Sequence, residues 1–149
     1  MKKFRLSNLI LLLFFLTILL FSCKKDDSDS FSIHFTAKFN NVSYVATSVT
    51  TNINYTWIVI SGAKGSESLG IFVPQDATTG TYDCNWIGDY CILYTSATGN
   101  YSIESGSVTI TKNDVAGKIL SGTFNCILTK ISLPADTLNV TQGSFSVKY

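Results

Sequence analysis

From Phe31 to the end of the chain, apolar and polar residues alternate with a period of two. The alternation is clearest in Ser107–Thr111, Leu120–Leu128 and Ser144–Tyr149. Successive side chains of an extended strand point to opposite faces, so this pattern predicts sheets with one buried and one solvated face, which is typical of antiparallel pairing. Thr, Val, Ile, Tyr and Phe are frequent, as strands favour. The sequence therefore predicts an all-β domain.

Turn-forming residues separate the expected strands. Asn40-Asn41 predicts a tight hairpin between the first strand and a second strand over Val42–Val49. Further turns are expected at Ala63–Ser66, Pro74–Asp76, Asn113–Gly117, Leu133–Asp136 and Gln142–Gly143. This spacing gives about nine strands, mostly paired with their neighbours in the chain. We expect an antiparallel β-sandwich, and the alternative is a small lipocalin-like β-barrel that could enclose a ligand.

The first 22 residues have the composition of a signal peptide. Lys2, Lys3 and Arg5 precede an apolar run over Leu9–Phe21 that only Thr17 interrupts. A membrane-spanning helix needs about 20 apolar residues, so the run fits a signal peptide better than a membrane helix. The expected divisions are a signal peptide over 1–22, a lipidated Cys and tether over 23–30, and one all-β domain over 31–149.

Leu20-Phe21-Ser22-Cys23 resembles the lipobox of bacterial lipoproteins. In that family the thiol of the cysteine takes a diacylglycerol and the preceding peptide is removed. The resemblance thus implies that Cys23 is acylated and anchors the chain to a membrane. The alternative is an N-terminal membrane helix with an incidental cysteine.

The seven residues after Cys23 include no apolar side chain, which predicts a solvated tether. Lys25, Asp26 and Asp27 also resemble the surface-export signal of Bacteroidota lipoproteins. This resemblance implies an outer-membrane location facing the cell exterior, and the alternative is a plain polar linker. The part of the chain after Cys23 contains no Arg and all ten acidic residues, so no basic surface for nucleic acid is expected.

Most of the chain after the tether is similar to a family of small, uncharacterised Bacteroidota lipoproteins. The similarity lies in strand ends and turns, at Phe35–Asn41, Gly80–Tyr82, Ser105–Lys112, Leu120–Phe124 and Val140–Val147. The similarity implies a fold and a cellular location. It identifies no functional residue because that family has no established activity.

No catalytic, cofactor or metal constellation is recognisable in the sequence. His34 is the one histidine, and it alternates with Phe35 toward the solvated face. Cys84, Cys91 and Cys126 remain after lipidation of Cys23, and Cys126 shares its face with core residues. A hairpin around Ile87-Gly88 would set Cys84 opposite Cys91, so a disulfide between these two is expected.

Aromatic residues gather around that hairpin. Tyr82, Trp86 and Tyr90 lie there beside short polar side chains. Exposed aromatic rings hold sugar rings or act as hot spots for proteins, whereas buried ones fill a core, and both interpretations are open for this segment. We expect a non-enzymatic binding or accessory module, with a glycan or protein as ligand; the alternatives are an inhibitor or small-ligand carrier, an enzyme that uses His34, and a structural coat protein.

Overall fold

The computed structural model describes residues 31–149, which form one compact unit. Ten β-strands account for the regular structure of these residues, and no helix occurs among them. No part of the described chain forms a helix that could cross a membrane. The strands are β1 His34–Phe39, β2 Val42–Val45, β3 Ser48–Asn54, β4 Trp57–Lys64, β5 Glu67–Pro74, β6 Gly80–Asp83, β7 Cys91–Ser96, β8 Gly99–Asp114, β9 Ile119–Lys130 and β10 Thr137–Lys148.

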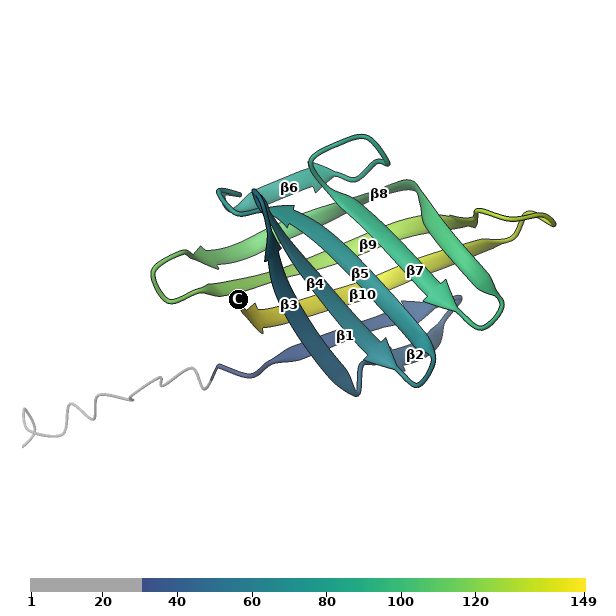
Figure 1. Cartoon of the computed structure of the whole chain (residues 1–149), viewed down its shortest axis with the longest axis horizontal. Helices are drawn as coiled ribbons and strands as arrows, with labels where there is room; N and C mark the ends of the chain where they lie inside the picture. Colours follow the sequence, from purple (N-terminus) through teal and green to yellow (C-terminus); the bar gives the residue numbers. More distant parts are fainter. Residues whose placement is uncertain (1–30) are drawn as a thin grey trace, which may run out of the picture. The chain divides into compact units, whose positions relative to one another are not determined.

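All strand pairs are antiparallel and belong to one sheet. The order across the sheet is β2-β1-β10-β9-β8-β7-β5-β4-β3, and β6 pairs with β8 beside this path. Figure 1 shows that β3, β4, β5 and β7 form a front layer that crosses over a back layer of β1, β10, β9 and β8. The prediction of an all-β antiparallel meander is thus confirmed.

The sheet bends at β8, which belongs to both layers. The first residues of β8 pair with β7, Ser107–Ile110 pair with β6, and β9 runs beside β8 along almost its whole length. Register shifts between Ile103 and Ser105 and between Ile110 and Lys112 interrupt this long ladder. Such bulges bend a strand and increase its twist. Hydrogen bonding therefore continues from layer to layer, and the result is a curled half-barrel, closer to the barrel-like alternative than to two separate sheets.

The two ends of the sheet approach each other without a ladder between them. Thr51 on the edge strand β3 donates its hydroxyl to the carbonyl oxygen of Lys148 on β10, at 2.8 Å. Tyr44 on β2 donates to the carbonyl oxygen of Gly62 on β4, at 2.6 Å. A Cβ atom at Gly62 would lie 2.5 Å from Cδ1 of Phe35, so glycine allows the layers to pack closely here.

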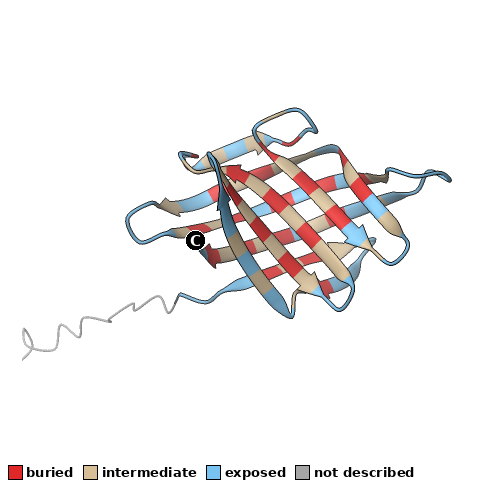
Figure 2. Ribbon diagram, in the orientation of Figure 1, coloured by how far each residue is buried: buried red, intermediate tan, exposed pale blue. Residues whose placement is uncertain are grey.

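The core fills the inside of the curl, and Figure 2 shows its buried residues as red bands along the strands. Phe124 contacts Phe35 and Phe145, with ring centroids 5.6 and 6.4 Å apart. No polar or charged residue is buried within residues 31–149, so apolar contact dominates the stability of the domain. The largest fully buried side chains are Tyr44, Phe35, Phe124, Phe145, Ile58, Ile60, Leu69, Ile71, Ile92, Ile110, Leu120 and Leu128.

Most predicted turns are confirmed, and two expectations are wrong. Asn40 and Asn41 form the predicted hairpin turn, and both have positive φ, as a type I′ turn requires. The strand expected over Val42–Val49 is broken at Ala46-Thr47, where the chain passes from β2 in one layer to β3 in the other. Gln142-Gly143 is not a turn but a bulge inside β10, where the register with β9 shifts.

Candidate functional site

An open groove of about 380 Å³ lies on the outer face of the front layer. Its floor comes from β4, β5 and β7, and its walls come from the β3–β4 turn and the loop between β6 and β7. Both tryptophans of the chain line it. The lining residues are Asn54, Tyr55, Trp57, Val59, Phe72, Trp86, Gly88, Cys91 and Leu93.

The floor follows from the register of the strands. Val59 pairs with Phe72, and Phe72 pairs with Cys91, so the three side chains form a row across β4, β5 and β7. Their neighbours along the strands, such as Ile58 and Ile71, point inward and are fully buried. Because side chains alternate between the faces of a sheet, the half-buried row faces outward. The front layer therefore has apolar side chains on both faces.

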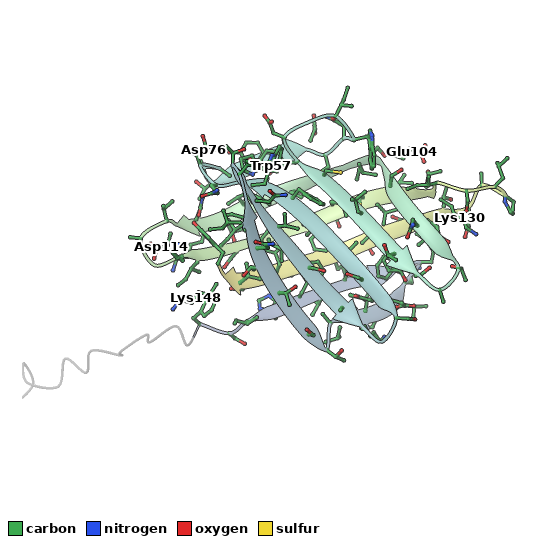
Figure 3. The ribbon with its side chains drawn as sticks, in the orientation of Figure 1. Trp57, Asp76, Glu104, Asp114, Lys130 and Lys148 are labelled. Atoms are coloured by element: carbon green, nitrogen blue, oxygen red, sulfur yellow. The ribbon has the colours of Figure 1, made fainter. Side chains whose placement is uncertain are left out.

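The β3–β4 turn forms the first wall and is held by Gln75. The Gln75 side-chain amide donates to the carbonyl oxygen of Tyr55 at 2.7 Å, and its backbone N–H donates to that of Thr56 at 2.8 Å. Tyr55 has a positive φ of 54°, a conformation that is uncommon for residues other than glycine. Its side chain is 92% exposed. Trp57 follows Thr56 and begins β4 (Figure 3).

Asn85 organises the loop that forms the second wall. Its side-chain oxygen accepts a hydrogen bond from the backbone N–H of Ile87, and its own backbone N–H donates to the carbonyl oxygen of Tyr90. A Cβ atom at Gly88 would lie 2.6 Å from the Asn85 side-chain oxygen, so a larger residue there would displace the Asn85 carboxamide. Trp86, at the exposed side of the loop, is 60% accessible to solvent.

No charged side chain lines the groove. The lining residues carry the carboxamide of Asn54, the hydroxyl of Tyr55, the thiol of Cys91 and two indole N–H groups. The surface is thus suited to an uncharged ligand that offers both apolar area and groups for hydrogen bonds.

Two of the three predicted binding aromatics, Tyr82 and Tyr90, contribute to the packing of the domain. Tyr90 is buried, and its ring stacks on that of Tyr82 at a centroid distance of 4.4 Å and an angle of 11°. The Tyr82 hydroxyl is held by Thr78. Burial, followed by the neighbouring Tyr82, raises the pKa of the Tyr90 hydroxyl above its usual range. Of the three, only Trp86 is exposed, and the stacked tyrosines support the base of its loop.

The cysteines of the described domain are all free thiols, so the expected bridge between Cys84 and Cys91 is not formed in this structure. Cys84 is buried in the core, whereas Cys91 is half-buried and lines the groove. Cys126 is buried too, as predicted. Burial first, and nearby thiols second, raise the pKa of Cys84 to about 12, and burial likewise raises that of Cys126 to about 12. Both thiols are therefore protonated and unreactive near neutral pH.

His34 is exposed and its neighbours are not carboxylates. One ring nitrogen lies 3.2 Å from the carbonyl oxygen of Ser32, and the other lies 3.1 Å from the hydroxyl of Ser144. Within residues 31–149, no group of three or more His, Cys, Asp or Glu side chains could hold a metal ion. The sequence-predicted lipidation site Cys23 and export signal Lys25, Asp26 and Asp27 lie outside the described residues.

Sequence reasoning identified Trp86 but missed the opposite wall of the groove. Trp57 and Tyr55 lie far from Trp86 in the sequence, and the pairing of β5 with β7 brings the two walls together. One signal was present: Trp57 and Val59 alternate with the core residues Ile58 and Ile60, which places apolar side chains on the solvated face of a strand.

The chain belongs to the family described as a domain of unknown function, DUF6252, which matches residues 32–147. The match covers nearly all of the described domain. No curated protein and no solved structure matches the chain.

Proposed function

We propose that this chain is a lipoprotein, anchored through Cys23 at the outer face of the outer membrane, whose β domain is a non-enzymatic binding module. The observation that carries the binding role is the convergence of both tryptophans on one open groove. Exposing apolar surface of this kind to water is unfavourable in free energy. Aromatic side chains at a concave surface are the usual anchors of a ligand. The curled sheet encloses a packed core, which favours the outer groove over a carrier site inside a barrel.

β1, the first described strand, lies in the back layer (Figure 1). The groove is on the outer face of the front layer, which β3, β4, β5 and β7 form.

The surface location is tested by treating intact cells with a protease and detecting the chain with an antibody. We expect digestion on intact cells, and we expect the Cys23→Ala variant to be lost from the membrane fraction. Replacing Lys25, Asp26 and Asp27 together by alanine should retain the lipid anchor but protect the domain until the outer membrane is broken. Protection of the unaltered chain on intact cells would contradict the surface location.

The binding role is tested on the purified domain, residues 31–149, by following tryptophan fluorescence. The probes are neutral oligosaccharides, acidic oligosaccharides and uncharged peptides that contain Phe and Leu. We expect a saturable change with at least one probe class, abolished in Trp86→Ala and retained in Val115→Ala, which removes an exposed apolar side chain at the β8–β9 turn. Binding that is the same in both variants would contradict a role for the groove.

A further inference from the structure

We propose that the groove binds a neutral sugar ring of a glycan chain, with the two tryptophans and the carboxamides of β3 as the recognition elements. This inference rests on the proposed binding function and names its ligand class. It is built on three properties of the groove: the aromatic walls, the amide border and the absence of charge.

The aromatic walls match the apolar face of a pyranose. A sugar ring presents C–H groups on its faces and hydroxyl groups around its rim, so it stacks on an indole while its rim stays available for hydrogen bonds. Trp57 and Trp86 come from opposite walls, and Val59 and Phe72 extend the apolar floor between them. Indole rings combine a large apolar surface with an N–H donor, which suits this mixed ligand.

Two carboxamides border the apolar floor. Asn54 pairs with Trp57, and Asn52 pairs with Val59, so both asparagines point to the same outer face as the groove. Both side chains are exposed and lie on β3, the last strand of the sheet order. A carboxamide donates and accepts hydrogen bonds at once, and adjacent hydroxyls of a sugar do the same. The arrangement places this polar border directly beside the aromatic platform.

The charge of the surroundings selects against acidic glycans. No Lys lines the groove, and the chain after Cys23 has no Arg, so a carboxylate or sulfate would find no cationic partner there. The groove therefore favours neutral sugars over anionic ones.

Both walls are fixed before a ligand arrives. Gln75 holds the β3–β4 turn through two hydrogen bonds, and Asn85 holds the opposite loop through its own pair. A site with this geometry loses little conformational entropy when it binds. Because the groove is open along the surface, a residue inside a longer glycan can enter it without a free chain end.

The test is titration calorimetry of residues 31–149, a unit with its own core, against cellohexaose, maltohexaose and mannohexaose. An oligogalacturonate and an uncharged Phe- and Leu-containing peptide serve as the other ligand classes. We expect at least one neutral hexaose to bind and the oligogalacturonate to bind more weakly by about tenfold or more. Trp86→Ala should weaken the neutral complex by about tenfold or more, as for a central aromatic anchor.

The border is tested with Asn54→Ala and Asn52→Ala, each expected to weaken binding several-fold with an unchanged circular dichroism spectrum. Asn139→Ala, at an exposed position of β10 in the back layer, is the matched control and should bind as the unaltered domain does. Trp57→Ala should weaken binding as Trp86→Ala does, and if it impairs folding, Trp57→Phe replaces it and should retain part of the affinity.

The outcomes separate the sugar from the binding function. Binding of the peptide or the oligogalacturonate alone, lost in Trp86→Ala, would overturn the neutral sugar and leave the groove as a binding site. Absence of any Trp86-dependent binding across all probes would overturn both proposals.

Discussion

The outer faces of the two layers differ in composition although both alternate with the same buried core. In the back layer, the outward positions of β9 and β10 are mostly polar, with Ile119 and Ile127 as exceptions, and the hydroxyls of Ser121 and Ser146 lie 2.9 Å apart. In the front layer, the outward positions at the groove hold Val59, Phe72 and Leu93, whereas Ser61 and Ser68 form a hydroxyl pair farther along β4 and β5, at 2.9 Å. A solvated sheet face needs only polar residues, so the apolar patch at the groove indicates a surface that serves contact with a ligand.

Substitutions on the inner and outer faces of β5 should have the most different effects, the inner one on stability and the outer one on binding. Ile71 is fully buried, and the adjacent Phe72 is half-buried in the floor of the groove. We expect Ile71→Ala to lower the free energy of unfolding by about 2–5 kcal/mol, because it leaves a cavity in the core. Phe72→Ala should cost clearly less stability but weaken ligand binding. Urea unfolding and titration of both variants measure this difference, and equal losses of stability would contradict the assignment of the two faces.

The raised pKa values of the buried thiols predict that the domain loses stability at alkaline pH. Burial raises the pKa of Cys84 and Cys126 to about 12 from an ordinary value of 9.0. Above pH 9 the unfolded chain loses these protons while the folded domain keeps them, so stability is complete below about pH 9 and decreases toward pH 12. Each group contributes a slope of up to about 1.4 kcal/mol per pH unit.

Thermal unfolding between pH 8 and pH 11 measures this slope. The double variant Cys84→Ala, Cys126→Ala should have a flatter dependence on pH, whereas Cys91→Ala, at the groove, should change it less. A slope that is unaffected by the double variant would mean that the thiols are not the groups that titrate.

The polar outer face of the back layer should tolerate substitution. Ser121→Ala removes one half-buried hydroxyl bond to Ser146, whose hydroxyl can still reach water, so we expect a loss of at most about 1 kcal/mol. Chemical denaturation checks the stability, and titration with the same glycans should give an unchanged affinity. A marked loss of affinity in Ser121→Ala would remove the distinction between the two outer faces.

The strands and most turns were predictable because they depend on local chemistry. Period-two alternation gives the strands, and Asn40-Asn41 gives a turn because asparagine tolerates positive φ. The error at Gln142-Gly143 has a related cause, because Gln142 does have a positive φ, but in a bulge of β10 and not in a turn. Local patterns do not distinguish these two uses of one backbone conformation.

The site was only half predictable because it depends on pairing between distant strands. Trp86 could be identified from its position in a polar loop. Tyr82 and Tyr90 have the same local signature, yet they stack on each other and pack at the base of that loop. The second wall, with Trp57, reaches Trp86 only through the β4–β5 and β5–β7 ladders, which no local pattern reveals.

One variant tests most directly whether the apolar outer face is a binding surface. The measurement is the midpoint of urea unfolding of Trp86→Ala, taken together with its affinity for a neutral hexaose. Trp86 is largely exposed, so we predict a midpoint close to that of the unaltered domain, with a free energy of unfolding that differs by at most about 0.5 kcal/mol, and a loss of most of the affinity. A clearly lower midpoint with unchanged affinity would contradict the account, because Trp86 would then be a structural cover for the front layer.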